Sequence, residues 1–152
     1  MMPIPTWRIF PILFVSLLLA ACASEPTPPP GVGFEVTADA QANNNRLFYF
    51  VVRAANEKQF MLESYEDVSS KAFSDPPDPG VLGVFSVVPG TTQNYTVSQP
   101  AQGAIALYFL FTQPGLQWKK LLGLPLEEKY NIELKENSQV NIKENKGWFP
   151  WF

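Results

Sequence analysis

Alternating apolar and polar positions cover most of the chain after residue 30. Residues 34–39 alternate strictly, with Phe34, Val36 and Ala38 on one face and Glu35 and Thr37 on the other. This alternation predicts a strand with one buried face. Similar alternation or short apolar runs recur at 47–54, 81–88, 91–98, 104–111, 116–122, 129–135 and 140–142. The sequence therefore predicts about eight short strands separated by turns.

Two of these segments differ from the others because they are apolar on both faces. Residues 47–54 are interrupted only by Arg53, and residues 104–111 form a continuous apolar run. A strand is apolar on both faces when other parts of the protein cover both faces. The two segments are therefore predicted to be central, buried strands. Pro89 and Gly90 separate segments 81–88 and 91–98, so we expect these to be adjacent strands around a turn.

One segment has a helical rather than an alternating period. Between residues 56 and 72, Met61, Tyr65, Val68 and Ala72 recur at helical spacing. Asn56, followed three residues later by a glutamine, is typical of an N-cap with a capping box. The prediction is an all-β fold, an antiparallel β-sandwich of about eight strands, with one helix inserted after the second strand.

The pattern before residue 31 indicates export rather than folded structure. Residues 9–21 are apolar apart from Ser16 and end directly before Cys22, the only cysteine. The run is too short to span a bilayer, which needs about 20 residues, but has the length of a signal peptide. Its end resembles the lipobox of bacterial lipoproteins, which implies cleavage after residue 21 and lipid on Cys22. The alternative is an ordinary signal peptide with a chance cysteine.

These patterns divide the chain into four parts. Residues 1–21 are the signal peptide, 22–30 a proline-rich tether, 31–146 the sandwich and 147–152 an aromatic segment. The aromatic segment has three interpretations: it packs on the sandwich, contacts a partner, or enters the membrane interface, where tryptophan is enriched. Its aromatic residues, the candidate anchor, are Trp148, Phe149, Trp151 and Phe152.

Composition narrows the possible functions. The net charge is −3 and the chain has no histidine, which argues against nucleic-acid binding and excludes histidine-dependent catalysis and metal sites. Carboxylates cluster at Glu63, Glu66 and Asp67, and as pairs at 75 and 78 and at 127 and 128. We interpret them as solvated faces or turns. The sequence thus predicts no enzyme, catalytic residue, metal or cofactor, and no small-molecule substrate.

Several segments together resemble one family. The order of the predicted elements resembles that of the type VI secretion outer-membrane lipoproteins, the TssJ family. This order is a lipobox, a tether, a strand, a polar loop, an apolar second strand, a helical insertion and further strands. The stretch 50–53 resembles the family's second strand, and 60–68 its insertion. The Pro-Gly turn and the segments 129–134 and 140–142 resemble its later turn and closing hairpin.

The resemblance implies a transthyretin-like β-sandwich, anchored by lipid to the periplasmic face of the outer membrane. It also implies a structural role in the secretion complex, as a partner of the periplasmic domain of the inner-membrane protein TssM. The residue after the cysteine, Ala23, is not aspartate, and by resemblance to the sorting rule for lipoproteins of Gram-negative bacteria this favours the outer membrane. The implied contact is the loop between the first two strands, which comprises Asp39, Ala40, Gln41, Ala42, Asn43, Asn44, Asn45 and Arg46. A solvated hairpin turn is the alternative for this loop.

Two other functions remain open at this point. One is an assembly factor of a different secretion or pilus machine, similar to a pilotin. The other is a periplasmic ligand-binding lipoprotein, which would need a concave apolar pocket with converging polar groups. A scaffold would instead have a filled sandwich and contacts on its loops.

Overall fold

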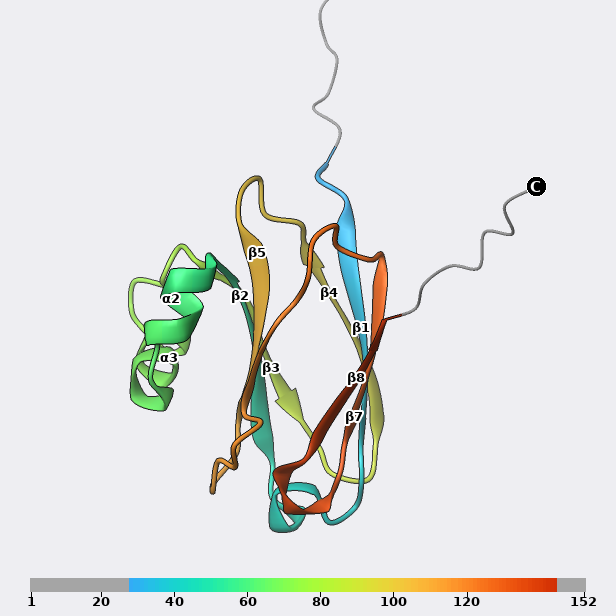
Figure 1. Ribbon diagram of the computed structural model, residues 1–152. Coiled ribbons are helices and arrows are strands. Elements are labelled where there is room, and N and C mark those ends of the chain that lie inside the picture. Colours follow the sequence, from blue (N-terminus) through green and yellow to red (C-terminus); the bar gives the residue numbers. More distant parts are fainter. Residues whose placement is uncertain (1–27, 145–152) are drawn as a thin grey trace, which may run out of the picture.

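Two four-stranded sheets pack face to face in the computed structural model, which describes residues 28–144 (Figure 1). Sheet A has the strand order β4-β1-β7-β8, and sheet B has the order β3-β2-β5-β6. The strands of sheet A are β1 (Gly31–Ala38), β4 (Thr92–Ser98), β7 (Lys129–Leu134) and β8 (Val140–Glu144). Those of sheet B are β2 (Phe48–Ala55), β3 (Val81–Val87), β5 (Ala104–Leu110) and β6 (Lys119–Leu121). The predicted β-sandwich of eight strands is confirmed.

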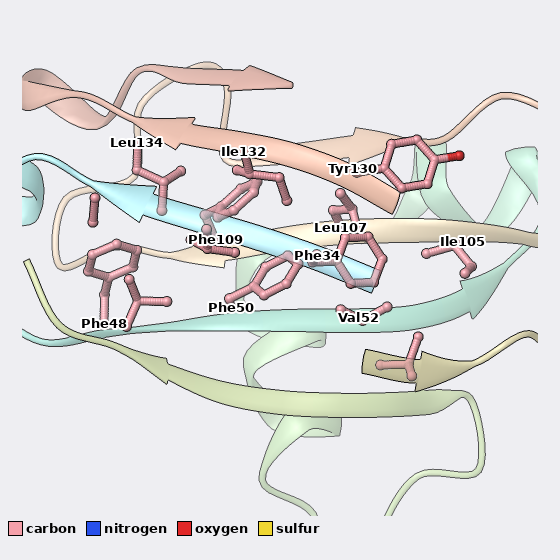
Figure 2. Packing of buried hydrophobic residues seen from close by; sticks show 14 of the residues in the cluster. Phe34, Phe48, Phe50, Val52, Ile105, Leu107, Phe109, Tyr130, Ile132 and Leu134 are labelled. Carbon is pink, nitrogen blue, oxygen red and sulfur yellow. The ribbon is translucent and has the colours of Figure 1, made fainter. Parts of the chain in front are cut away.

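The main core fills the space between the sheets (Figure 2). Phe34 of β1 lies 5.5 Å from Phe50 of β2 between ring centroids, and Phe50 stacks on Phe109 of β5 at 5.3 Å. Tyr130 of β7, the register neighbour of Phe34 in sheet A, stacks on Phe34 at 5.8 Å between ring centroids. These residues are almost fully buried, because alternate positions of each strand point to the same side of its sheet.

The second face of sheet B explains the two doubly apolar segments. Strands β2 and β5 are its central pair. Their remaining apolar side chains pack against a helical insertion of α2 (Glu57–Leu62) and α3 (Tyr65–Ala72), which covers this face (Figure 1). The members of this second cluster include Val51, Val68, Ala106 and Tyr108.

The insertion contains two short helices instead of the single predicted helix. The Asn56 capping box is present, since its side chain accepts from Gln59 N at 2.8 Å and Gln59 accepts from Asn56 N at 2.9 Å. A second capping box at Ser64 and Asp67 starts α3. Its extended N-cap interrupts the helical period, and Met61 is consequently 71% exposed. The Ser-x-x-Asp spacing was the sequence signal for this break.

Two predicted strand relations are wrong. Strands β3 and β4 lie in different sheets, so the turn at Pro89 and Gly90 crosses the sandwich rather than closing a hairpin. Strands β1 and β7 pair in parallel, so sheet A is not wholly antiparallel. Strand direction alternates along the chain, which gives all odd-numbered strands one direction. Two odd-numbered neighbours are therefore parallel, whereas every other neighbouring pair is antiparallel.

The sixth strand is shorter than predicted. It spans three residues, and Leu116, expected at its start, is fully exposed. The residues before it form a loop that meets the β7–β8 turn, where Val140 N donates to Gln117 Oε1 at 3.3 Å. Among residues 28–144, no helix has the length and apolar character needed to span a membrane.

Candidate functional site

The loop between β1 and β2 lies at one end of the sandwich, the end opposite the start of β1 (Figure 1). Strand β1 has eight residues, which separates these ends by about 25 Å. We call the loop end the distal end, because it lies opposite the end at which β1 begins. Since β1 and β2 belong to different sheets, the loop crosses from one sheet to the other and is not a hairpin turn.

The loop has an unusual backbone, fixed by a buried side chain. Asn43, Asn44 and Asn45 have φ values of 50°, 56° and 58°, the left-handed region that asparagine tolerates better than most residues. Asn43 is 3% exposed. Its amide nitrogen donates to Arg46 O at 2.9 Å, and its Oδ1 accepts from Thr112 N at 2.8 Å. The loop is therefore held to the end of β5 in one conformation.

Other loops complete the distal surface. A depression of about 230 Å³ is lined by side-chain amides and a hydroxyl from three connections, namely Asn43, Asn44, Gln113, Asn137 and Ser138. Beside it, Leu47 is 51% exposed and Val88 is 43% exposed. Leu47 directly precedes Phe48 and Val88 directly follows Val87, and Phe48 and Val87 are register partners in sheet B. The surface thus offers hydrogen-bonding groups next to apolar side chains, a combination that suits protein contact.

The structure places the predicted loop residues in two groups. Ala42 and Asn43 are buried and support the loop. The other six predicted residues, Asp39, Ala40, Gln41, Asn44, Asn45 and Arg46, are exposed or half-buried on the distal surface. Residues Leu47, Val88, Gln113, Asn137 and Ser138 join them. Sequence reasoning missed these five because only the tertiary structure brings four separate connections together. The Asn-Ser pair in the last turn was the one available signal.

The remaining sequence-predicted sites lie outside the described residues. Cys22 precedes residue 28, and Trp148, Phe149, Trp151 and Phe152 follow residue 144.

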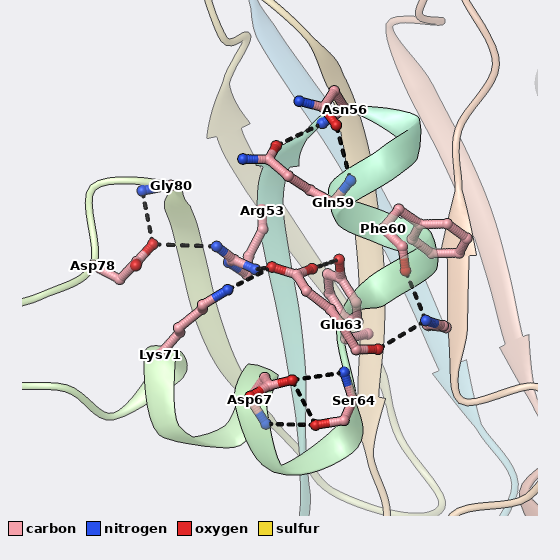
Figure 3. A network of polar contacts seen from close by, with 12 residues as sticks. Arg53, Asn56, Gln59, Phe60, Glu63, Ser64, Asp67, Lys71, Asp78 and Gly80 are labelled. Atoms are coloured by element: carbon pink, nitrogen blue, oxygen red, sulfur yellow. Dashed lines mark hydrogen bonds and ion pairs between the residues drawn. The ribbon is translucent and has the colours of Figure 1, made fainter.

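The interpretation of the carboxylate cluster is wrong for Glu63. This residue is 8% exposed and lies over sheet B, where Arg53 Nη1 donates to Oε1 and the Tyr108 hydroxyl donates to Oε2 (Figure 3). Lys71 Nζ donates to Oε1 at 2.8 Å. Glu66 and Asp67 of α3 are exposed, as expected.

The acid–base properties of this cluster follow from its contacts. Burial opposes ionisation of Glu63, but hydrogen bonds from Lys71, Tyr108 and Arg53 outweigh it and hold the pKa of Glu63 below its ordinary value of 4.5. Burial and the bond to Glu63 raise the pKa of Tyr108 well above its usual range. The resulting charged carboxylate, with its oxygens bound to three donors, fixes structure and leaves no proton acceptor poised for a substrate.

The same cluster holds the insertion to the sheet. Asp78 Oδ1 accepts from Arg53 Nη2 at 3.3 Å and from Gly80 N at 2.9 Å. Lys119 Nζ of β6 donates to the carbonyl oxygens of Phe60 at 2.7 Å and Glu63 at 2.9 Å, at the end of α2. A cation is favourable at a helix carboxyl end. Arg53, the one polar residue of an apolar strand, is therefore structural.

Replacement of Asn43 by alanine is expected to lower the free energy of unfolding by about 2–4 kcal/mol, because a lost buried hydrogen bond costs about 1–3 kcal/mol and a left-handed backbone costs alanine roughly 1 kcal/mol more. Asn44→Ala is the matched control, since Asn44 is exposed with a similar backbone. Urea denaturation measures both. Equal stabilities of the two variants would contradict the role of the Asn43 side chain.

Comparison with known proteins gives a family and a fold. A family model described as IglE, N-terminal domain, matches residues 49–134, more than half of the chain. No curated protein matches by sequence. Three solved structures share the fold: the T6SS lipoprotein TssJ1 of Pseudomonas aeruginosa, Lip of Serratia marcescens, which is a membrane-bound component of the Type VI Secretion System, and a chain of a Type VI membrane complex.

The structural likeness spans nearly all of each neighbour. The TssJ1 match has a TM-score of 0.60 at 14% identity and covers 79% of this chain and 99% of the other. The Lip match has a TM-score of 0.58 at 14% identity and covers 77% of this chain and 98% of Lip. The match to the membrane-complex chain has a TM-score of 0.60 at 13% identity and covers 76% of this chain and 98% of the other. The resemblance to TssJ seen in the sequence is thus confirmed as a shared fold. The chain belongs to the family of the IglE N-terminal domain, built on the β-sandwich of the TssJ-type lipoproteins.

Proposed function

We propose that this chain is a lipoprotein of a type VI secretion membrane complex, with a structural and non-enzymatic role. The observation that carries the proposal is the shared fold, which reproduces 98–99% of the length of three type VI secretion proteins. The lipobox-like end of the apolar run before Cys22 supports attachment to a membrane. The residue after it, Ala23, favours the outer membrane, on its periplasmic face.

The proposed partner is the periplasmic domain of a TssM-like inner-membrane protein, bound at the distal surface. The position of this surface supports the proposal, because it faces away from the end at which the tether joins β1. An anchored domain therefore presents the asparagine-rich loop toward the periplasm. The rigid loop backbone also supports binding, since a surface fixed in advance loses little conformational entropy when a partner binds.

Co-purification from detergent-solubilised membranes tests the proposal. The tagged chain is expected to bring down a TssM-like protein, and deletion of its gene is expected to abolish type VI secretion. Absence of both effects would overturn the proposal. Capture of components of another secretion or pilus machine would instead support the pilotin-like alternative.

Replacement of Leu47 by aspartate is expected to weaken binding of the purified periplasmic domain by about 100-fold. A charge buried in an interface without a partner costs several kcal/mol, and about 2.7 kcal/mol corresponds to that factor. Titration calorimetry measures the affinity.

Leu124→Asp is the matched control for this binding experiment. Leu124 is 67% exposed in the connection between β6 and β7, away from the distal end. Its variant is expected to bind like the native chain. Equal affinity of both variants would place the contact elsewhere on the domain.

A further inference from the structure

The two lateral sides of the sandwich differ. On one side β3 of sheet B lies beside β4 of sheet A, and on the other side β6 lies beside β8. The β3–β4 side is closed, because Phe85 stacks on Tyr95 with ring centroids 4.4 Å apart and the Tyr95 hydroxyl donates to Ser86 O at 2.8 Å. Gln93 Oε1 accepts from Val88 N at 3.0 Å. Side chains of β4 thus cover outward backbone groups of β3 and of the residue that follows it.

The β6–β8 side is open instead. Two adjoining depressions of about 240 and 420 Å³ lie between these strands and share Lys120 and Ile142 in their linings. Val140 and Ile142 of β8 pack against the main core but are only half-buried. Lys120 lies on the same face of sheet B as its register partner Leu107, a core residue, yet it is exposed. The core therefore reaches the surface along this side, which we call the β6–β8 groove.

Strand β8 directs backbone groups into this groove. It is an edge strand of sheet A, and β7 is its neighbour. Val140 N points away from β7, since it donates to Gln117 Oε1 at 3.3 Å. Alternate residues of an edge strand direct their backbone groups to opposite sides, so the N–H and C=O groups of Ile142 and Glu144 also point away from β7. An extended peptide can pair with these groups and continue the sheet.

The chemistry of the groove specifies the side chains of such a peptide. An added strand places alternate side chains on the core face, where apolar ones would cover the half-buried Val140 and Ile142. Lys120 faces the same space and favours a carboxylate among them. The neighbouring Lys119 is on the other face of β6, where its Nζ donates to two carbonyl oxygens at the end of α2. Lys120 therefore offers its charge to a partner.

A second copy of this chain fits the groove less well than another protein. Two β8 strands paired about a two-fold axis would bring both β6 edges together, and with them Lys120 of each copy. Like charges that face each other are unfavourable.

The groove is continuous with the distal surface. Leu116, which is fully exposed, and Gln117 line the groove and belong to the connection between β5 and β6. The same connection contributes Gln113 to the depression on the distal surface. A segment of a protein seated on the distal surface can therefore run directly into the groove.

We propose that the β6–β8 groove binds an extended segment of the partner's periplasmic domain, which adds to β8 as a fifth strand of sheet A. Its apolar side chains pack on Val140 and Ile142, and an acidic side chain meets Lys120. The inference rests on the proposed function, because it assigns a second binding element to the same partner. Main-chain hydrogen bonds supply affinity in this mode, and the side chains supply specificity.

Amide hydrogen exchange tests the added strand directly. The full chain is followed by NMR, alone and with the purified periplasmic domain of the TssM-like protein as the probe. The N–H groups of Ile142 and Glu144 are expected to exchange quickly in the free chain and slowly in the complex. Those of Asn141 and Lys143 point toward β7 and serve as the internal control, with slow exchange in both states. Unchanged exchange at Ile142 and Glu144 in the complex would overturn the inference.

Reversal of the charge in the groove tests the chemistry of the segment. Lys120→Glu is expected to weaken binding of the periplasmic domain at least about tenfold, because like charges would then meet. Lys58→Glu is the matched control, since Lys58 is exposed on α2, over the outer face of sheet B. It is expected to bind like the native chain. Titration calorimetry measures both, and equal affinities of the two variants would also overturn the inference.

The inference and the proposed function fail in different ways. If the periplasmic domain does not bind the native chain, both are wrong. If it binds the native chain and Leu47→Asp weakens binding, but Lys120→Glu does not, the distal contact stands and only the added strand is wrong.

Discussion

Replacement of Glu63 by alanine is expected to lower the free energy of unfolding by about 3–5 kcal/mol, the usual cost of removing one partner from a buried ion pair. Arg53 would keep only Asp78, at 3.3 Å, as an anionic partner. Tyr108, which is fully buried, would lose the acceptor of its hydroxyl. The penalty arises mainly from these two buried groups, since Lys71 is partly exposed and can be solvated.

A matched control for this substitution lies three residues along the chain. Glu66→Ala removes an exposed carboxylate of α3, and its stability is expected to stay within about 0.5 kcal/mol of the native chain. Urea denaturation of residues 22–152 measures both variants. If Glu63→Ala were as stable as Glu66→Ala, the cluster would not hold the insertion to sheet B.

The pH dependence of stability offers an independent measure of the same cluster. The pKa of Glu63 is held below its ordinary value of 4.5, so its contribution is complete above pH 4.5 and decreases as the pH falls through the folded-state pKa. The stability difference between native chain and Glu63→Ala is therefore expected to be largest near neutral pH and to narrow in acid. A difference that stayed constant down to pH 2 would contradict this assignment.

Replacement of Cys22 by serine is expected to abolish lipid attachment completely, because no other cysteine is available. The lipobox resemblance implies acyl chains on both the thiol and the new amino terminus of Cys22. Such chains would make membrane binding practically permanent, since each buried methylene contributes about 0.8 kcal/mol. The first strand of the described residues begins at Gly31, so the variant is expected to fold. Mass spectrometry of the amino terminus measures lipid attachment, membrane fractionation measures membrane binding, and circular dichroism measures folding.

The control for the cysteine variant is Ser24→Ala, a similarly small change two residues further along the tether. It is expected to retain lipid, outer-membrane location and secretion. If Cys22→Ser remained in the outer membrane and supported secretion at the native level, the proposed lipid attachment would be wrong.

The strand content could be predicted because it depends on local alternation. Six of the eight strands, namely β2, β3, β4, β5, β7 and β8, lie within about two residues of their predicted bounds. Strand β1 begins three residues earlier than predicted, and β6 begins three residues later. The doubly apolar segments correctly indicated the central pair of sheet B, since both faces of β2 and β5 are covered. The Asn56 capping box was also predictable, because its partners are only three residues apart.

The errors concern contacts between residues distant in sequence. A Pro-Gly turn has the same local chemistry whether the next strand joins the same sheet or the opposite one, so the crossing at Gly90 could not be predicted from the turn. Glu63 was placed with solvated carboxylates because its neighbours in sequence are polar. Its partners Arg53 and Tyr108 are 10 and 45 residues away, and only folding brings them within hydrogen-bonding distance.

The sequence by itself determined the β-sandwich class, the inserted helical region, the candidate lipid site at Cys22 and the loop now found at the distal end. All of these depend on short-range patterns of polarity, on capping or on a single residue type. Only the tertiary structure decided which strands are neighbours, how Asn43 fixes the loop, and which other connections join the distal surface. These features depend on sheet order and strand direction, which are set by packing between distant segments of the chain.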